Sequence, residues 1–155
     1  MRKIFFGLLT ACLMIVGSMQ CQASEYGSTE EQAEAVELLN ELRESVGVDE
    51  LYWDPDSFIQ AAAEVRAEEL EQYFSHTRPD GSDCFTALRE FDIDYRTCGE
   101  NIAYGTALDA DGVIEMWTNS PGHYANMING EFGEVGLASW HADDGIVYWV
   151  QMFIG

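Results

Sequence analysis

Two histidines and two glutamates stand apart from the other ionisable residues of this sequence. His76, Glu100, Glu115 and His123 lie beside predicted turns or strand ends, whereas most acidic residues fall on solvated helix faces. Two imidazoles and two carboxylates could bind a divalent cation or exchange protons, because neutral imidazole suits zinc-class metals and a carboxylate raises imidazole basicity. Taken alone, such a histidine is more often a surface or capping residue. The sequence contains no HExxH, paired CxxC or calcium-loop pattern, so a metal site is a hypothesis here.

The first residues of the chain have the pattern of a secretory signal peptide. Arg2 and Lys3 precede an apolar run over residues 4–16, and a small residue, Ala23, follows shortly after. The apolar run is too short to span a bilayer comfortably. We therefore expect residues 1–23 to be removed and the chain to be secreted; cleavage after Ser18 and a lipid anchor on Cys12 or Cys21 fit less well.

Cleavage leaves two cysteines, Cys84 and Cys98, in an oxidising compartment. An even pair of cysteines in such a chain predicts a disulfide between them. The alternative is a reactive thiol beside a histidine, which needs a reduced thiolate that this compartment disfavours.

The charge of the chain excludes several partners. Its 155 residues carry 28 acidic and 7 basic side chains, and losing Arg2 and Lys3 takes the formal charge from −21 to −23 and leaves no lysine. Such a chain is expected to bind neither nucleic acid nor an anionic membrane surface. A charge of this size usually serves solubility rather than one specific site.

Helical periodicity covers much of the first half of the chain. Ser28 and Glu31 form a capping box for a helix that ends near Gly47. Asp54 as N-cap and Pro55 at the first position predict a second helix. Its expected buried stripe consists of Phe58, Ala61, Ala62, Val65 and Leu70. Shorter helices are expected over residues 85–91 and after Asp109 or Asp111, the latter ending before a turn at residues 120–122.

Strand patterns dominate the second half. We expect strands over residues 99–104, 134–141 and 146–154, with a turn between the last two. The final strand is apolar on both faces, so helices should cover both sides of the sheet. The pattern predicts an α+β fold with one domain of about 130 residues.

Six short motifs occur together and in order along residues 39–153. They are Leu39-Asn40 with Arg43, Leu51-Tyr52-Trp53-Asp54, Phe74-Ser75-His76 before Arg78-Pro79-Asp80-Gly81, Gly99-Glu100-Asn101-Ile102-Ala103, Met116-Trp117 before Ser120-Pro121-Gly122-His123, and Tyr148-Trp149-Val150-Gln151-Met152-Phe153. This set resembles the CAP superfamily, also called the SCP-like or pathogenesis-related-1-like extracellular domain, in its bacterial form. The resemblance assigns residues 24–32 to a lead-in with the start of the first helix and residues 33–155 to the CAP domain.

The resemblance implies a three-layer α-β-α sandwich with a mainly antiparallel central sheet. It also implies that His76, Glu100, Glu115 and His123 converge on a central cleft. In that reading the two histidines hold zinc or another divalent cation, and the two glutamates are nearby acid or base groups. Tyr124 departs from the pattern, since many relatives have arginine at this position.

Two functional hypotheses remain open, and the sequence does not decide whether the protein is an enzyme. The first is a secreted binding or interaction module whose cleft holds a cation and an extracellular lipid, peptide or glycan. The alternative is a metal-assisted hydrolase, of peptidase or esterase type, in which His76 and His123 hold the ion and Glu100 or Glu115 takes a proton from water. A purely structural polar network is a third interpretation, and the oligomeric state is open.

Overall fold

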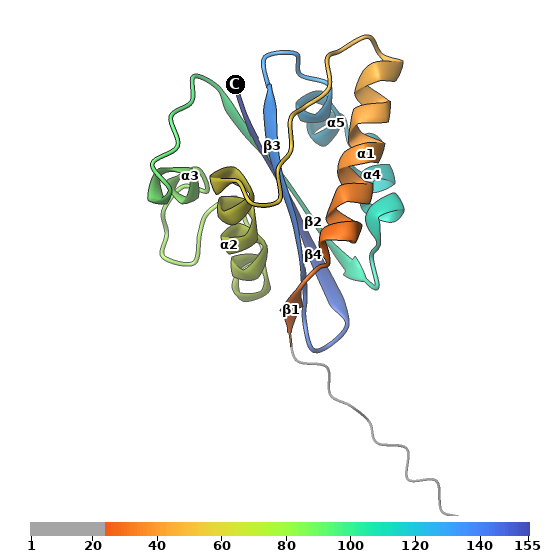
Figure 1. Cartoon of the computed structure of the whole chain (residues 1–155). Helices are drawn as coiled ribbons and strands as arrows, with labels where there is room; N and C mark the ends of the chain where they lie inside the picture. Colours follow the sequence, from red (N-terminus) through yellow and green to blue (C-terminus); the bar gives the residue numbers. More distant parts are fainter. Residues whose placement is uncertain (1–23) are drawn as a thin grey trace, which may run out of the picture.

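A sheet of four antiparallel strands runs through the centre of the computed structural model, which describes residues 24–155 (Figure 1). The strands are β1 (Glu25–Tyr26), β2 (Cys98–Thr106), β3 (Glu134–His141) and β4 (Ile146–Ile154), in the order β1-β3-β4-β2. The expected strands at 134–141 and 146–154 are confirmed, and the expected strand at 99–104 is three residues longer. The predicted signal peptide, residues 1–23, lies outside the described residues.

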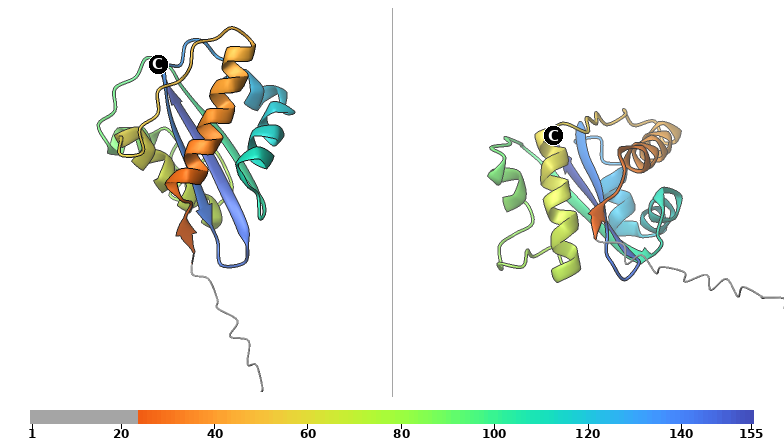
Figure 2. Two further views of the ribbon diagram at one scale, coloured as in Figure 1. Left: turned by 45° about the vertical axis from the view of Figure 1, so that its right-hand side comes forward. Right: turned by 60° about the horizontal axis from the view of Figure 1, so that its bottom comes forward.

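Helices cover both faces of this sheet. On one side lie α2 (Phe58–Gln72) and α3 (Thr86–Glu90), and on the other α1 (Thr29–Ser45), α4 (Ala110–Thr118) and α5 (Pro121–Met127) (Figure 2). Alternate residues of β4 enter the two cores: Trp149 and Phe153 face α1 and α4, while Val150 and Met152 face α2. The predicted three-layer α-β-α sandwich is therefore confirmed. Among residues 24–155, no helix is long and apolar enough to cross a bilayer.

The helix starts agree with the capping predictions at two of three places. The Ser28 hydroxyl accepts a hydrogen bond from the Glu31 backbone N–H at the start of α1, and the Asp109 carboxylate caps α4. The prediction that Asp54 caps the second helix was wrong. Ser57 is the N-cap of α2, and Asp54 instead accepts a hydrogen bond from the Asp56 backbone N–H in the turn before it. Both residue types stabilise helix starts, and only tertiary packing selects between them.

The buried stripe of α2 also differs from the expected one. Phe58 is exposed, and the buried residues are Ile59, Gln60, Ala62, Ala63, Arg66, Ala67 and Leu70. The helix packs very close to the sheet at Gly136 of β3, where an added Cβ would lie 2.2 Å from the Ile59 carbonyl oxygen. The small residues on both sides of this contact explain the short approach.

The expected turn at residues 120–122 is the beginning of a helix. Pro121 occupies the first turn of α5, where its missing N–H costs no hydrogen bond and its fixed φ suits a helix. His123 therefore projects from the first turn of a short helix rather than from a loop.

β2 forms one edge of the sheet, and side chains cover that edge. The Glu100 carbonyl accepts a hydrogen bond from the Asn126 amide, and the Ile102 carbonyl accepts one from the Trp117 indole N–H. Both carbonyls point away from β4, because N–H and C=O groups on an antiparallel strand alternate between its two sides. The capped edge is thereby protected against pairing with another strand.

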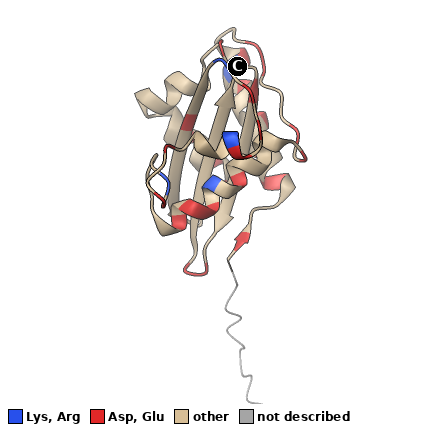
Figure 3. Cartoon of the chain, turned by 90° about the vertical axis from the view of Figure 1, so that its left-hand side faces the viewer, with Lys and Arg blue, Asp and Glu red and all other residues tan. Residues whose placement is uncertain are grey.

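Acidic residues dominate the surface. On the side covered by α2 and α3, acidic positions lie along the ribbon close to the few basic positions (Figure 3). Three of the five arginines after residue 23 are buried, namely Arg43, Arg66 and Arg78.

Candidate functional site

Two neighbouring residues of β2 each hold one of the histidine segments. Successive strand residues face opposite sides of a sheet. On the α2 side, Glu100 Oε1 lies 2.7 Å from Nδ1 of His76. On the α5 side, the Asn101 amide donates to the His123 carbonyl at 3.1 Å. The Glu-Asn pair thus anchors both histidines to one edge strand, although they are 47 positions apart in the sequence.

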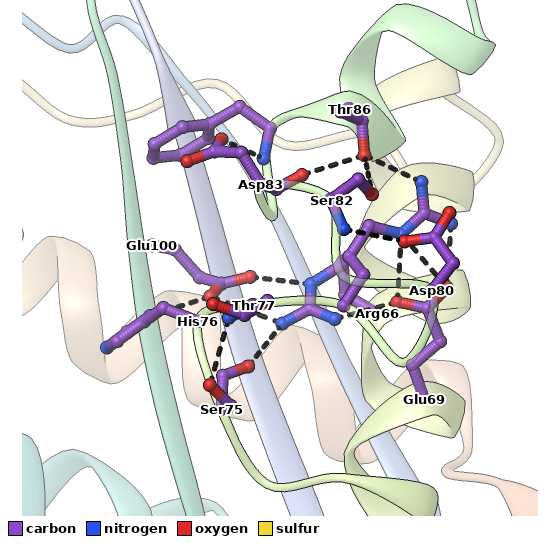
Figure 4. A network of polar contacts seen from close by, with 12 residues as sticks. Arg66, Glu69, Ser75, His76, Thr77, Asp80, Ser82, Asp83, Thr86 and Glu100 are labelled. Atoms are coloured by element: carbon purple, nitrogen blue, oxygen red, sulfur yellow. Dashed lines mark hydrogen bonds and ion pairs between the residues drawn. The ribbon is translucent and has the colours of Figure 1, made fainter.

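Glu100 is a buried carboxylate with a buried arginine as its partner. Nε of Arg66 donates to Oε2 of Glu100 at 2.8 Å, and Nη2 lies 3.4 Å from Oε1 (Figure 4). The same Nη2 donates to the Ser75 carbonyl at 2.8 Å. Arg66 therefore both neutralises Glu100 and fixes the residue that precedes His76.

The ion pairs continue along α2 to the loop that carries His76. Glu69 bonds Arg66 at 2.7 Å and Arg78 at 2.6 Å, and Arg78 also bonds Glu90 of α3 at 2.6 Å. Arg78 Nη1 donates to the hydroxyl of Thr86 as well. This network ties residues 75–90 to α2 and holds the His76 loop in place.

One ring nitrogen of His76 bonds to Glu100, and the other can bond to a further partner. A carboxylate paired with arginine only accepts hydrogen bonds, so Nδ1 of His76 is the donor and Nε2 remains for another partner. The side chain of His76 as a whole is 57% exposed. The hydrogen bond to Glu100 outweighs desolvation and raises the pKa of His76. Glu100 thus sets both the tautomer and the orientation of this ring.

His123 differs in its electrostatics. Burial, and then the nearby charge of His76, lower its pKa, so the ring is neutral at neutral pH. It borders an apolar cavity of about 270 Å³ at the edge of β2. The cavity is lined by Phe74, Ile102, Ala103, Tyr104, Met116, Trp117, Ser120 and His123. A neutral imidazole thus lies at the margin of a space that could hold a small apolar group.

Glu115 is exposed on α4. Within residues 24–155, its side chain forms no hydrogen bond or ion pair, and it is absent from the cavity lining, whereas Trp117 two positions later is fully buried. The structure therefore joins His76 to Glu100 and anchors the backbone of His123 from the next residue of the same strand, with the two rings near enough for the charge of His76 to lower the pKa of His123. It shows no bond from Glu115 to any of these three.

The two cysteines are free thiols, so the predicted disulfide between Cys84 and Cys98 is not seen in the structure. A disulfide also requires that the two sulfurs face each other. Cys84 is buried with its sulfur toward His76 and Glu100, and Cys98 lies beside the Tyr95 hydroxyl. Burial, reinforced by the charge of Glu100, raises the pKa of Cys84 to about 12.

His76, Cys84 and Glu100 form a compact group whose ligand-type atoms lie within 4.8 Å of one another. It is a poor cation site as it stands, because Arg66 already supplies a positive charge to Glu100 and the Cys84 thiol stays protonated at neutral pH. The outer nitrogen of His76 and the ring of His123 are the better candidates to hold a metal.

Sequence reasoning missed the residues that support the site. Glu69 was among the acidic residues expected on solvated helix faces, Arg66 was not considered, and Arg78 was noted only as part of a motif. A signal was present, because Arg66 falls one helical turn after Ala62, on the apolar stripe of α2. A charged residue at such a position indicates a buried partner.

The bond between His76 and Glu100 is expected to make stability depend on pH. Because folding raises the pKa of His76, its contribution is fully present below the unfolded value of about 6.5 and is lost as the pH rises through the folded value. His76→Gln should therefore destabilise the metal-free chain more at about pH 5.5 than at about pH 8. Urea unfolding with a chelator at both pH values measures the difference.

Glu100→Gln provides the matched background for this comparison. In that background, His76→Gln should no longer be more destabilising at about pH 5.5 than at about pH 8, because the charged acceptor is gone while burial and the charge of Arg66 both lower the pKa of His76. Equal effects at the two pH values in the parent chain would contradict the prediction.

The fold and the sequence together define the class of this protein. Residues 36–153 match the family model described as CAP, the cysteine-rich secretory protein family. The chain belongs to the CAP family, as its motifs had indicated.

Individual relatives are bacterial. The chain is 33% identical over 124 residues to the uncharacterized protein YkwD of Bacillus subtilis, covering 80% of this chain and 47% of that protein. It is 31% identical over 114 residues to the uncharacterized membrane protein YlbC of the same organism, covering 70% of this chain and 31% of that protein. The chain thus spans less than half the length of either relative.

Solved structures share the fold. An extracellular protein with an SCP domain from Bacillus anthracis superposes with a TM-score of 0.70 at 25% identity, over 81% of this chain and 40% of that one. An outer surface protein of Borrelia burgdorferi gives a TM-score of 0.74 at 22% identity, over 84% of this chain and 97% of that one. The second likeness concerns the fold alone.

Proposed function

We propose that this domain is an extracellular binding module whose cleft holds a zinc-class divalent cation between Nε2 of His76 and the ring of His123. The single observation that carries the proposal is the contact of His76 Nδ1 with a buried, arginine-paired carboxylate. Metal-binding histidines commonly donate their other N–H to a carboxylate, which orients the ring and raises its basicity.

The residues present fit such an ion. His123 is neutral at neutral pH, as a ligand must be, and Asn101 fixes its backbone from the strand that also carries Glu100. A zinc-class ion held by two imidazoles supplies open coordination positions for an oxygen, nitrogen or sulfur atom of a ligand. The adjacent apolar cavity would take the non-polar part of that ligand.

The hydrolase alternative has weaker support. Both carboxylate oxygens of Glu100 already accept hydrogen bonds from Arg66 or His76, which leaves this group poorly placed to take a proton from water. Glu115 forms no side-chain hydrogen bond within residues 24–155 that would orient it as a base. A general base must lie within hydrogen-bond reach of the proton it removes.

The relatives support a location outside the cell. One solved neighbour is described as an extracellular protein and another as an outer surface protein. Together with the signal-peptide pattern of residues 1–23, these descriptions favour secretion of this chain.

Zinc titration by calorimetry tests the proposed site. We expect saturable one-site binding that is lost in the double variant His76→Ala with His123→Ala. Glu100→Gln should keep both ligands but weaken binding by about 10-fold to 100-fold, because the ring of His76 loses its charged partner.

His141→Ala is the matched control for the titration. His141 is the third histidine of the chain, and its Nε2 lies 2.9 Å from Glu31 rather than beside β2. Binding that survives the double variant, or that is lost equally in His141→Ala, would overturn the proposal. Cleavage of a peptide or ester library that is lost in Glu115→Gln, but not in the surface variant Glu37→Gln, would establish the hydrolase instead.

A further inference from the structure

Four aromatic side chains form one row across the whole width of the sheet. Tyr26 of β1 is in register with Trp140 of β3, Trp140 with Tyr148 of β4, and Tyr148 with Tyr104 of β2. All four lie on the α2 side, since Trp140 and Tyr148 pack against the core beneath that helix. We call these four residues and Phe74 the aromatic row.

The rings of the aromatic row contact one another at both of its ends. Tyr26 and Trp140 meet edge to face with centroids 4.8 Å apart, and Tyr104 stacks on Tyr148 at 6.0 Å. Phe74, two residues beyond the end of α2, extends the row with an edge contact to Tyr104 at 4.6 Å. The result is an extended aromatic surface that begins beside the His123 cavity, which Phe74 and Tyr104 also line.

The aromatic row lies where α2 stops covering the sheet. Its outer members keep much of their surface in solvent: Tyr26 is 40% exposed, Phe74 42% and Tyr104 50%. Core packing therefore does not account for these rings, and a contiguous exposed aromatic surface typically marks an interaction site.

Carboxylates line this surface, and the arginine that precedes them on α2, Arg66, is buried in ion pairs. Glu68 accepts a hydrogen bond from the Tyr26 hydroxyl at 2.8 Å, and Glu71 accepts one from the Trp140 indole at 2.6 Å. Residues 97–155, which supply three of the four strand positions, contain no lysine or arginine. The combination of aromatic faces with negative charge is complementary to a cation.

We propose that the aromatic row binds a basic, extended polypeptide segment of a partner protein, whose arginine or lysine side chains lie over the rings and near Glu68 and Glu71. Neighbouring strands are about 4.8 Å apart, so the four-strand row is about 14 Å wide. An extended chain rises about 3.3 Å per residue and crosses that width in about five residues. None of the residues of the aromatic row is a proposed metal ligand, and two of them, Phe74 and Tyr104, also line the cavity beside His123.

The test uses the secreted chain and a labelled hexapeptide of alternating arginine and glycine, followed by fluorescence anisotropy in about 0.15 M salt. The double variant Tyr104→Leu with Tyr148→Leu leaves the net charge unchanged. It should weaken binding by about tenfold, since two cation–π contacts are removed. The matching lysine-glycine peptide should bind more weakly than the arginine peptide, because arginine stacks on aromatic faces.

Tyr52→Leu is the matched control, since Tyr52 is 61% exposed and lies beside a carboxylate, Asp54, outside the aromatic row. It should leave affinity within about twofold. If both variants weakened peptide binding equally, or if neither weakened it, net charge alone would attract the peptide. Either result would overturn the proposal. Binding of a neutral oligosaccharide, such as a chitin hexamer, that is lost in the double variant while peptide binding is kept would also overturn it.

A second measurement covers the case in which the double variant does not fold. The Trp140 indole N–H, identified in the nuclear magnetic resonance spectrum by its loss in Trp140→Phe, should shift on addition of the arginine peptide to the unmodified chain. The Trp53 indole, which donates to Gln60 elsewhere, should not shift. A shift of neither indole, or of both equally, would contradict binding at the aromatic row.

Discussion

Arg66→Met is expected to lower the free energy of unfolding by about 3–5 kcal/mol, because it leaves the buried Glu100 carboxylate without its cationic partner. Methionine fills much of the space of the arginine stem, so the effect comes mainly from the unpaired charge. The same change should weaken zinc binding, since Arg66 also holds Ser75 next to His76. Urea unfolding and the zinc titration measure the two effects.

Two further variants, a double substitution and a surface control, test the Arg66 prediction. Arg66→Met combined with Glu100→Met removes both charges and should recover much of the lost stability, because replacing both members of a buried pair is far less costly than removing one. Arg89→Met, at an exposed position of α3, should change stability by less than about 0.5 kcal/mol. A loss in Arg66→Met no larger than in Arg89→Met would show that Glu100 is stable without its partner.

Arg43→Met should be about as damaging, for a different reason. Arg43 is fully buried and donates to four backbone carbonyls, those of Asp49, Met127, Asn129 and Phe132. Desolvation lowers its pKa, against the nearby charge of Asp49. Without the guanidinium, several buried carbonyl oxygens have no hydrogen-bond donor. The free energy of unfolding should therefore fall by about 3 kcal/mol or more in urea titrations.

Arg43→Lys separates charge from geometry. A single ammonium group keeps the charge but cannot reach carbonyls on all sides of a planar guanidinium, so it should restore only a minor part of the stability. Full recovery with lysine would mean that the positive charge, and not the multiple hydrogen bonds, stabilises this junction between α1 and the segment after α5.

The long strands β3 and β4 were the most predictable part of the fold, whereas the short β1 was not expected. The expected bounds of β3 and β4 match the structure, because β4 is an apolar run on both faces and Asp143-Asp144-Gly145 separates it from β3. The start of α2 was less predictable, since Asp54 and Ser57 are both good caps and only packing against Gly136 and its neighbours selects the register. The sequence did not predict that α5 begins at Pro121, because Ser-Pro-Gly is equally typical of a turn.

The site was predictable only where short motifs mark it. The Gly-Glu-Asn-Ile-Ala and Ser-Pro-Gly-His motifs pointed to Glu100 and His123, and the structure explains why Glu and Asn are adjacent, since each holds one histidine segment. The network of Arg66, Glu69 and Arg78 joins residues of a helix and a loop, and such pairings depend on tertiary packing that no local pattern encodes. The disulfide expectation used the even number of cysteines and the expected compartment, and neither says where a sulfur points.

The burial of three arginines has a consequence for how proteases and chemical reagents attack the folded domain. Residues 24–155 contain no lysine, and Arg43, Arg66 and Arg78 are enclosed by the fold, so only Arg89 and Arg96 are exposed. Trypsin-like proteases, which cut after basic residues, would therefore find two accessible positions in the folded domain, one of them inside a helix. Reagents that acylate lysine amines would find no lysine target in this part of the chain.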